Sequence, residues 1–135
     1  MALIEIVRDV RFSQDEAWNR LIDWRRHGDF VPLTSIRLTD DGFVARTGVG
    51  PVAFDDPMEI VTLEAPSFCR LEKRGRVVTG WAELRVTPFG DLTRVVWRED
   101  IHVTGTPRFA DGLTKASSRK LFGRVIDGLL APTAT

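Results

Sequence analysis

Three side chains in this sequence are placed to move a proton. Glu99 falls between Trp97 and Ile101 on the apolar side of an alternating segment, so its carboxyl is expected to point inward. Burial raises the pKa of a carboxyl toward neutrality, where a general acid or base works best. Asp56 falls on the same side of its strand as the apolar residues that follow it. His102 falls on the outer side of its strand, but histidine is the commonest general base, so it remains a candidate. These residues are the candidates for proton transfer.

Two of these residues also have a simple structural interpretation. Asp56 precedes Pro57, where a carboxylate commonly caps a bend through Asx hydrogen bonds, and we favour that role for it. His102 is typical of a solvated strand residue. A second histidine, His27, follows two arginines at the expected end of a helix, where cations complement the helix dipole. We expect His27 to have no further role.

Arg8 is the charged residue on the apolar side of the first predicted strand. If the first and last strands of the sheet are neighbours, we expect Arg8 and Glu99 to form an ion pair inside the molecule. A lone buried charge is costly, whereas a pair is tolerable. The pair would either anchor a polar group of a ligand or close the sheet near a cavity mouth, and we favour the structural role.

Other kinds of chemistry receive little support. Cys69 has inward parity and no histidine near it in sequence, so it resembles a small buried hydrophobe more than a nucleophile. The spacing of Ser117 and Lys120 matches Ser-x-x-Lys, but the companion motifs are missing. Residues 48–51 are too short and wrongly placed for a phosphate loop. We therefore expect no metal and no cofactor.

Composition limits the class of protein. The chain has 135 residues, with 19 Lys plus Arg and 19 Asp plus Glu, which gives zero net charge and argues against nucleic-acid binding. This length predicts one domain over 1–135. The first ten residues contain acidic and basic side chains, and no segment is apolar enough to span a membrane. Together with a single cysteine, this indicates a cytoplasmic protein without stable membrane insertion.

The clearest structural signal is a β-hairpin over residues 81–100, in which two alternating segments flank a turn at Pro88, Gly90 and Asp91. The hydrophobic pattern fixes the register, because a slip by one residue would turn Trp97 outward. The expected inner pairs are Leu84 with Trp97, Val86 with Val95, and Ala82 with Glu99; the outer pairs are Glu83 with Arg98 and Arg85 with Val96.

The remaining elements follow from periodicity and capping signals. Residues 3–12 form a strand, and the capping box at residues 13–16 begins a helix that ends at Gly28, with a short helical turn over residues 29–31. Strand patterns then continue to Val103, which gives about seven strands. Thr106 is a plausible N-cap with Pro107 at the first helical position, and the last and longest helix runs to about Leu130.

The apolar residues of this last helix occupy two faces. Phe109, Leu113 and Ala116 share one side, whereas Phe122 and Ile126 are displaced around the axis. The displaced face is expected to pack either against the short helices or against another subunit, as in a homodimer.

The order of these elements resembles the helix-grip fold, an α+β architecture in which a curved, seven-stranded antiparallel sheet wraps a long C-terminal helix and two short helices follow the first strand. Residues 61–100 resemble the SRPBCC or START-like superfamily, particularly its bacterial polyketide cyclase/dehydrase and lipid-transport branch. The matching features are the turn at Ala65 and Pro66, the basic strand over residues 70–76, and the Thr93, Arg94 and Trp97 pattern.

The resemblance implies a cavity between the sheet and the last helix. A solid core is the alternative, although the small inward residues Gly80, Ala82 and Ala45 favour an open space. The residues expected to contact a ligand are Arg8, Phe43, Met58, Ile60, Leu84, Trp97, Glu99, Leu113 and Lys120.

Three functions are compatible with this expectation. The first is binding of a hydrophobic small molecule such as a lipid, polyketide or aromatic metabolite. The second is a polyketide cyclase or dehydratase that uses an inward carboxylate, in which shape and exclusion of water do part of the work. The third is a protein-interaction module that uses the face near Phe122 and Ile126. We rank binding first, because no acid–base constellation stands out.

Overall fold

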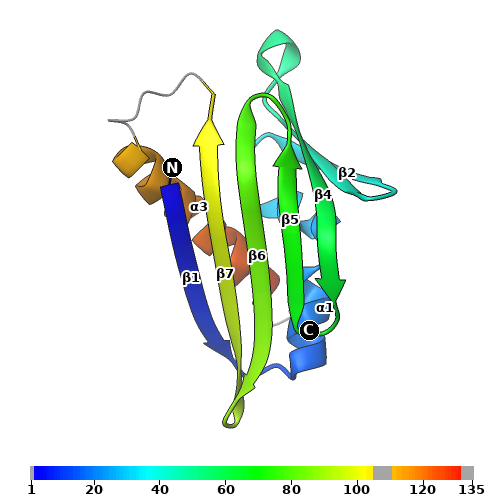
Figure 1. The fold of residues 1–135 in the computed structure, drawn as a ribbon, viewed down its shortest axis with the longest axis vertical. Coiled ribbons are helices and arrows are strands. Elements are labelled where there is room, and N and C mark those ends of the chain that lie inside the picture. Colours follow the sequence, from blue (N-terminus) through cyan, green and yellow to red (C-terminus); the bar gives the residue numbers. More distant parts are fainter. Residues whose placement is uncertain (1, 105–110, 132–135) are drawn as a thin grey trace.

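The computed structural model describes residues 2–104 and 111–131. Its elements are β1 (Ala2–Val10), α1 (Gln14–Leu21), α2 (Trp24–His27), η1 (Gly28–Phe30), β2 (Thr34–Thr39), β3 (Gly42–Thr47), η2 (Gly50–Val52), β4 (Phe54–Glu64), β5 (Phe68–Arg74), β6 (Val78–Phe89), β7 (Leu92–Val103) and α3 (Asp111–Leu129). The seven strands form one antiparallel sheet in the order β1-β7-β6-β5-β4-β3-β2. Helix α3 crosses behind the sheet, and α1 lies at one end of it (Figure 1).

Local signals form most of these elements as the sequence predicts, but the single helix expected to reach Gly28 is wrong: α1 ends at Leu21, and α2 begins separately at Trp24. The Ser13 side chain accepts a hydrogen bond from the Glu16 backbone amide and begins α1. The Glu16 carboxylate accepts from Arg20 one turn later, so the reciprocal half of the capping box is replaced by an ion pair. The predicted cap at Thr106 and the first helical turn at Pro107 lie outside the described residues.

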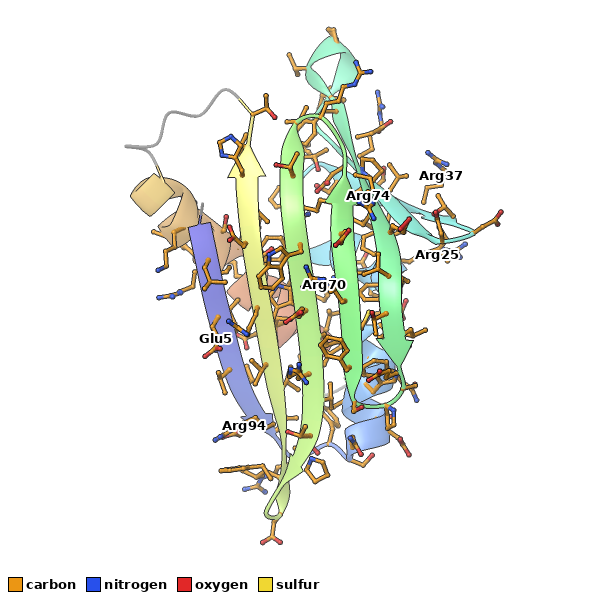
Figure 2. All side chains as sticks on the ribbon, in the orientation of Figure 1. Glu5, Arg25, Arg37, Arg70, Arg74 and Arg94 are labelled. Atoms are coloured by element: carbon orange, nitrogen blue, oxygen red, sulfur yellow. The ribbon has the colours of Figure 1, made fainter. Side chains whose placement is uncertain are left out.

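The β6–β7 hairpin has the predicted register at every expected pair, both inner and outer. The outer face of the sheet carries charged side chains, as Figure 2 shows around the labelled Arg70 of β5 and Arg94 of β7. Although Glu83 lies opposite Arg98, it accepts a hydrogen bond from Arg70 of β5 at 2.6 Å. Arg98 instead pairs with Glu5 of β1. The charged side chains on the outer face of the hairpin therefore pair with the neighbouring strands, Glu83 with β5 and Arg98 with β1.

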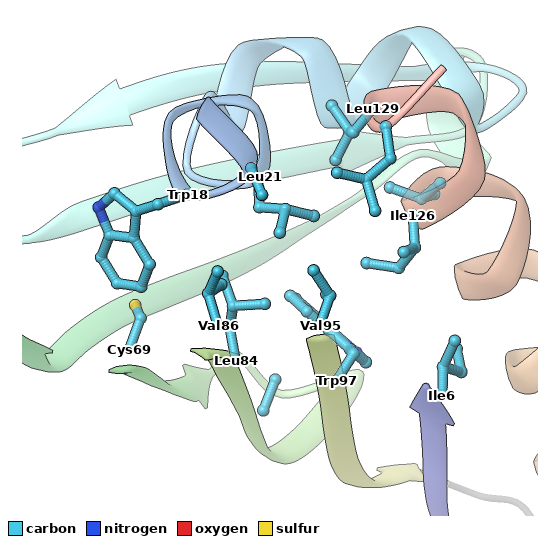
Figure 3. Packing of buried hydrophobic residues seen from close by; sticks show 14 of the residues in the cluster. Ile6, Trp18, Leu21, Cys69, Leu84, Val86, Val95, Trp97, Ile126 and Leu129 are labelled. Atoms are coloured by element: carbon cyan, nitrogen blue, oxygen red, sulfur yellow. The ribbon is translucent and has the colours of Figure 1, made fainter. Parts of the chain in front are cut away.

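The inner face divides into a packed half and a hollow half. The packed half lies against α1 and the C-terminal turns of α3, where the close-up of Figure 3 shows buried aliphatic and aromatic side chains in contact. Its buried members include Trp18, Leu21, Leu84, Val86, Val95, Ile126 and Leu129. The hollow half lies beside the preceding turns of α3 and contains the cavity described below.

The displaced face of α3 is internal. Phe122 stacks on Trp97 with ring centroids 6.0 Å apart, and Ile126 is buried in the core. The prediction that this face could bind a partner protein is therefore wrong, because the curved sheet already covers it. Ala116 is exposed, whereas Ser118 faces inward.

Candidate functional site

A cavity of about 240 Å³ lies between the inner face of the sheet and α3. Its wall is mostly apolar and comes from the strands, from α2 and from α3. The apolar lining includes Ile36, Phe43, Met58, Trp97, Phe122 and Val125. Three charged or titratable strand residues, Asp56, Lys73 and Glu99, also line it. An apolar enclosure with a few convergent polar groups is the usual form of a small-molecule site.

Lys73 and Asp56 form an ion pair in this wall. The Lys73 Nζ donates to Asp56 Oδ2 at 2.9 Å, and the two side chains are only 4% and 12% exposed. Lys73 Nζ also lies 3.8 Å from the sulfur of Met58. Because removal of either partner would leave a buried charge, the two side chains hold each other in place.

Glu99 is the most deeply buried ionisable residue of the site, and 0% of its surface is exposed. Neither of its carboxyl oxygens has a hydrogen-bond partner in the described structure. Burial raises the pKa of Glu99 to about 8; Lys73 and the nearby Trp97 indole oppose this shift, and Asp56 adds to it. At neutral pH the Glu99 carboxyl is therefore mostly protonated and can donate a hydrogen bond.

The sheet brings these groups together from β4, β5 and β7. Strand β6 runs between β5 and β7, and at the site its inner residues are Gly80 and Ala82, which pair with Lys73 and Glu99 respectively. Ala82 lines the cavity, and its small side chain leaves space above β6 between Lys73 and Glu99.

Gly80 is not among the residues that line the cavity, and its small size has a cause that the sequence does not reveal. A Cβ at this position would lie 1.9 Å from the Asp100 carbonyl oxygen, and the backbone has φ +127°. Glycine is therefore required by the close approach of β7.

The other polar residues of the lining are His27, Thr34, Thr47 and Ser118. His27 is buried, and its Nε2–H donates to the Leu21 carbonyl oxygen at 2.7 Å. Burial lowers its pKa, only partly opposed by that hydrogen bond and by Asp23. The prediction that His27 serves only the helix dipole is wrong, because α2 folds its ring inward beside Trp24.

Several predicted residues meet at the cavity. Phe43, Met58, Trp97 and Glu99 line it, and so does Asp56, for which we had favoured a bend-capping role. Asp56 lies inside β4, and its carboxylate bonds Lys73.

The expected ion pair between Arg8 and Glu99 does not form. Glu99 lies opposite Ile4, four residues along β1 from Arg8, which lies opposite Val95. Four residues of strand span about 13 Å, too far for the two side chains to meet. The Arg8 guanidinium bonds Asp127 of α3 at 2.7 Å, and both side chains are largely solvated.

The other candidates lie away from the cavity. Leu84 belongs to the packed half, and Ile60 lies against the core edge in a separate shallow pocket with Leu38. Lys120 and His102 are exposed. The side chain of Leu113 lies outside the described residues.

Lys73 is the site residue that the sequence prediction missed. It has the inward parity of Cys69 and Leu71 on the same strand, which was the available signal. Cys69 is buried as expected, and burial raises the pKa of its thiol to about 11, which keeps it unreactive. Within residues 2–104 and 111–131, no group of three or more His, Cys, Asp or Glu side chains could hold a metal ion.

Comparisons with known proteins bear on the fold. No family model and no curated protein matches the sequence. Among solved structures, XoxI from Bacillus cereus superposes with a TM-score of 0.73 at 14% identity, covering 96% of this chain and 94% of that one. Ara h 8.0201 gives 0.67 at 8% identity, with 96% and 98% covered.

The di-domain ARO/CYC StfQ from the steffimycin biosynthetic pathway gives a TM-score of 0.67 at 12% identity, covering 96% of this chain and 50% of that one. The chain therefore has the helix-grip fold, as its sequence predicts. No helix in the described part of the chain is long and apolar enough to cross a membrane.

Proposed function

We propose that this protein binds a hydrophobic small molecule in the cavity between its sheet and α3. The observation that carries the proposal is the cavity itself: about 240 Å³ of space with a mostly apolar wall and a buried, unpartnered Glu99. Protein cores have few voids larger than a water molecule. An engineered apolar cavity of about 150 Å³ binds benzene, so a ligand of one or two rings suits this space.

Similar structures support the proposal at the level of the fold. One of them is the ARO/CYC protein of a biosynthetic pathway, and the same architecture surrounds the cavity here. We extend the proposal to lipids, polyketides and aromatic metabolites as ligand classes. Residues 1–135 would act as one ligand-binding unit in the cytoplasm, consistent with a single, buried cysteine.

Binding of naphthalene, measured by titration calorimetry, tests this function. Ala45 lines the cavity and is 8% exposed, so Ala45→Leu should fill part of the space and weaken naphthalene binding at least tenfold. Ala116 is exposed on α3, and Ala116→Leu provides a matched control that should bind like the unaltered protein. Absence of naphthalene binding by the unaltered protein would refute the proposal.

A second candidate is an enzyme that transfers a proton, as in a cyclase or dehydratase. It is favoured by one observation: the Glu99 carboxyl lines an apolar cavity and has a pKa of about 8. When ionised, such a carboxylate can remove a proton from a carbon next to a ketone, and its conjugate acid can return one. Asp56 is already paired with Lys73, so Glu99 is the better candidate.

Exchange of hydrogen for deuterium in 2-tetralone tests the catalytic candidate. If Glu99 removes a proton beside the ketone, the protein should accelerate exchange in deuterated water, and Glu99→Gln should abolish the acceleration. Mass spectrometry of recovered 2-tetralone measures both rates. Equal exchange with and without protein would leave only the binding function.

A further inference from the structure

We propose that the Asp56, Lys73 and Glu99 side chains recognise a hydroxyl group, alcoholic or phenolic, on a ligand that is neutral and otherwise apolar. This inference rests on the proposed function and specifies the chemistry of the ligand's polar end. It requires three features of the cavity: unpartnered polar atoms, balanced charge, and the presence of both donors and acceptors at one place.

The first feature is a set of buried polar atoms without hydrogen-bond partners. In the described structure these include Asp56 Oδ1, both carboxyl oxygens of Glu99, and Nε1 of Trp97. All three residues line the cavity. A buried polar group without a partner costs free energy, so a ligand that supplies the missing hydrogen bonds gains affinity.

The second feature is the balance of charge. Lys73 and Asp56 contribute one positive and one negative charge, joined at 2.9 Å. Glu99 is mostly neutral at pH 7. His27, the other titratable residue in the wall, is buried, and its lowered pKa also keeps it neutral. An ionic ligand would bring an uncompensated charge into this enclosure, which is expensive to bury. The site therefore favours a neutral ligand.

The third feature is that donors and acceptors stand together. The protonated Glu99 carboxyl and the Trp97 indole N–H can donate, whereas Asp56 Oδ1 can only accept. A ketone or an ether can only accept and would leave Asp56 Oδ1 unsatisfied. A hydroxyl group can accept from one donor and donate to the free oxygen of Asp56. Among simple neutral groups, it matches this arrangement best.

The placement of the apolar wall agrees with this orientation. Phe43 and Met58 line the cavity from the strands, and Phe122 lines it from α3. The small side chain of Ala82 on β6 leaves space between Lys73 and Glu99. A ring system lying between the aromatic side chains could therefore extend its hydroxyl toward the sheet at β6.

A matched set of naphthalene probes tests the inference by titration calorimetry at pH 7. We expect 2-naphthol to bind about tenfold more tightly than naphthalene or 2-methoxynaphthalene, since one satisfied buried hydrogen bond contributes a factor of that order. Charged probes, 2-naphthoate and 2-naphthylmethylammonium, should bind more weakly than naphthalene. Equal affinity for 2-naphthol and 2-methoxynaphthalene, or a preference for either ion, would overturn the inference.

Substitutions test whether Asp56, Lys73 and Glu99 cause the preference for a hydroxyl group. The double variant D56N/K73M removes both charges and avoids leaving one buried alone, and Glu99→Gln keeps the shape of Glu99. Each should reduce the ratio of 2-naphthol to 2-methoxynaphthalene affinity severalfold. Glu5→Gln, on the outer face of β1, should leave both this ratio and the naphthalene affinity unchanged. An unchanged ratio in both site variants refutes the assignment.

The affinity for naphthalene distinguishes failure of the hydroxyl preference from failure of ligand binding itself. If naphthalene binds but the hydroxyl gives no advantage, the inference fails while the binding function stands. If no member of the set binds, the binding function itself fails.

Discussion

Glu99 is the residue whose protonation state sets the charge of the cavity. It is completely buried, yet it carries an ionisable group with no hydrogen-bond partner in the described structure. Evolution of a core for stability alone would favour an apolar residue of similar volume at such a position. The position of Glu99 in the cavity wall therefore supports a role in recognition or proton transfer.

The raised pKa of Glu99 predicts a dependence of stability on pH. Its ordinary value is 4.5, and in the folded protein it rises to about 8. Between these values the folded state binds a proton that the unfolded state has lost, so the free energy of unfolding falls as pH rises, by up to about 1.4 kcal/mol per pH unit. The contribution is fully present below about pH 4.5 and is lost as pH rises through 8.

Glu99→Gln isolates this effect, since the amide does not titrate. Urea denaturation at pH 5 and pH 8 should show the variant gaining stability relative to the unaltered protein at the higher pH. His27, whose pKa is lowered, weakens both proteins equally as the pH falls below about 6.5, so the difference between them reports Glu99. A difference that does not change with pH would contradict a raised pKa.

The pair of Lys73 and Asp56 predicts strong coupling between two substitutions. Lys73→Met should lower the free energy of unfolding by about 3 kcal/mol, because the Asp56 carboxylate is then buried without its partner. The double variant D56N/K73M should recover most of that loss. Urea denaturation of the single and double variants measures the coupling. Simple additivity of the two single effects would contradict a buried ion pair between Lys73 and Asp56.

At the scale of elements, β6 sets the spacing between the polar side chains of the cavity wall. It lies between the strands that carry Lys73 and Glu99, and it presents the small side chain of Ala82 to the cavity between them. A larger side chain at Ala82 would fill the space between the charged groups. The strand therefore serves both as a spacer and as part of the ligand wall.

Substitution of Gly80 tests the close approach of β6 to β7. Gly80→Ala would place a methyl group 1.9 Å from the Asp100 carbonyl oxygen, so it should destabilise the protein by more than about 2 kcal/mol. Gly90 in the hairpin turn also has positive φ, at +62°, but has nothing within 4 Å of an added Cβ. Gly90→Ala should therefore cost only the backbone strain, about 1 kcal/mol. Equal losses in thermal or urea denaturation would contradict the steric argument.

Different turns of helix α3 contact different parts of the interior. Ser118 and Phe122 line the cavity, whereas Ile126 and Leu129 pack into the closed half of the core. Near the end of α3, the Phe30 ring packs directly against Gly128. A Cβ added at Gly128 would lie only 2.4 Å from that ring. The helix is thus fixed at its C-terminal end and forms a wall of the cavity further toward its start.

At the scale of the whole molecule, the division into packed and hollow halves separates stability from binding. The packed half holds the sheet against α1 and the end of α3 (Figure 3), so the hollow half can remain open. A ligand that binds only the folded state should therefore stabilise the entire protein by mass action.

Thermal denaturation measures that linkage. Naphthalene at 100 times its dissociation constant should raise the free energy of unfolding by about 2.7 kcal/mol and shift the melting temperature upward by several degrees. Ala45→Leu should reduce the shift at the same naphthalene concentration. Ala116→Leu should preserve it. A shift of equal size in both variants would indicate binding outside the cavity.

The sequence was sufficient for most of the fold because period-2 alternation fixes which face of a strand is buried. The hairpin from Trp81 to Asp100 shows this, since each predicted pair appears in the observed register. The same reasoning placed Glu99 inside correctly. It failed for Arg8, because parity gives the face of the sheet and does not give the position along a neighbouring strand.

What the sequence determined by itself was therefore the order of elements, the register of the last hairpin and the inward direction of Glu99. Tertiary structure decided which residues meet Glu99: Lys73 and Asp56 converge from strands distant in sequence, while Arg8 turns to Asp127 of α3. It also decided that the displaced face of α3 is covered by the sheet and that a cavity of about 240 Å³ stays open between the sheet and α3. The physical reason is that alternation is a local property of one strand, whereas partners and empty volume depend on the curvature of the whole sheet around α3.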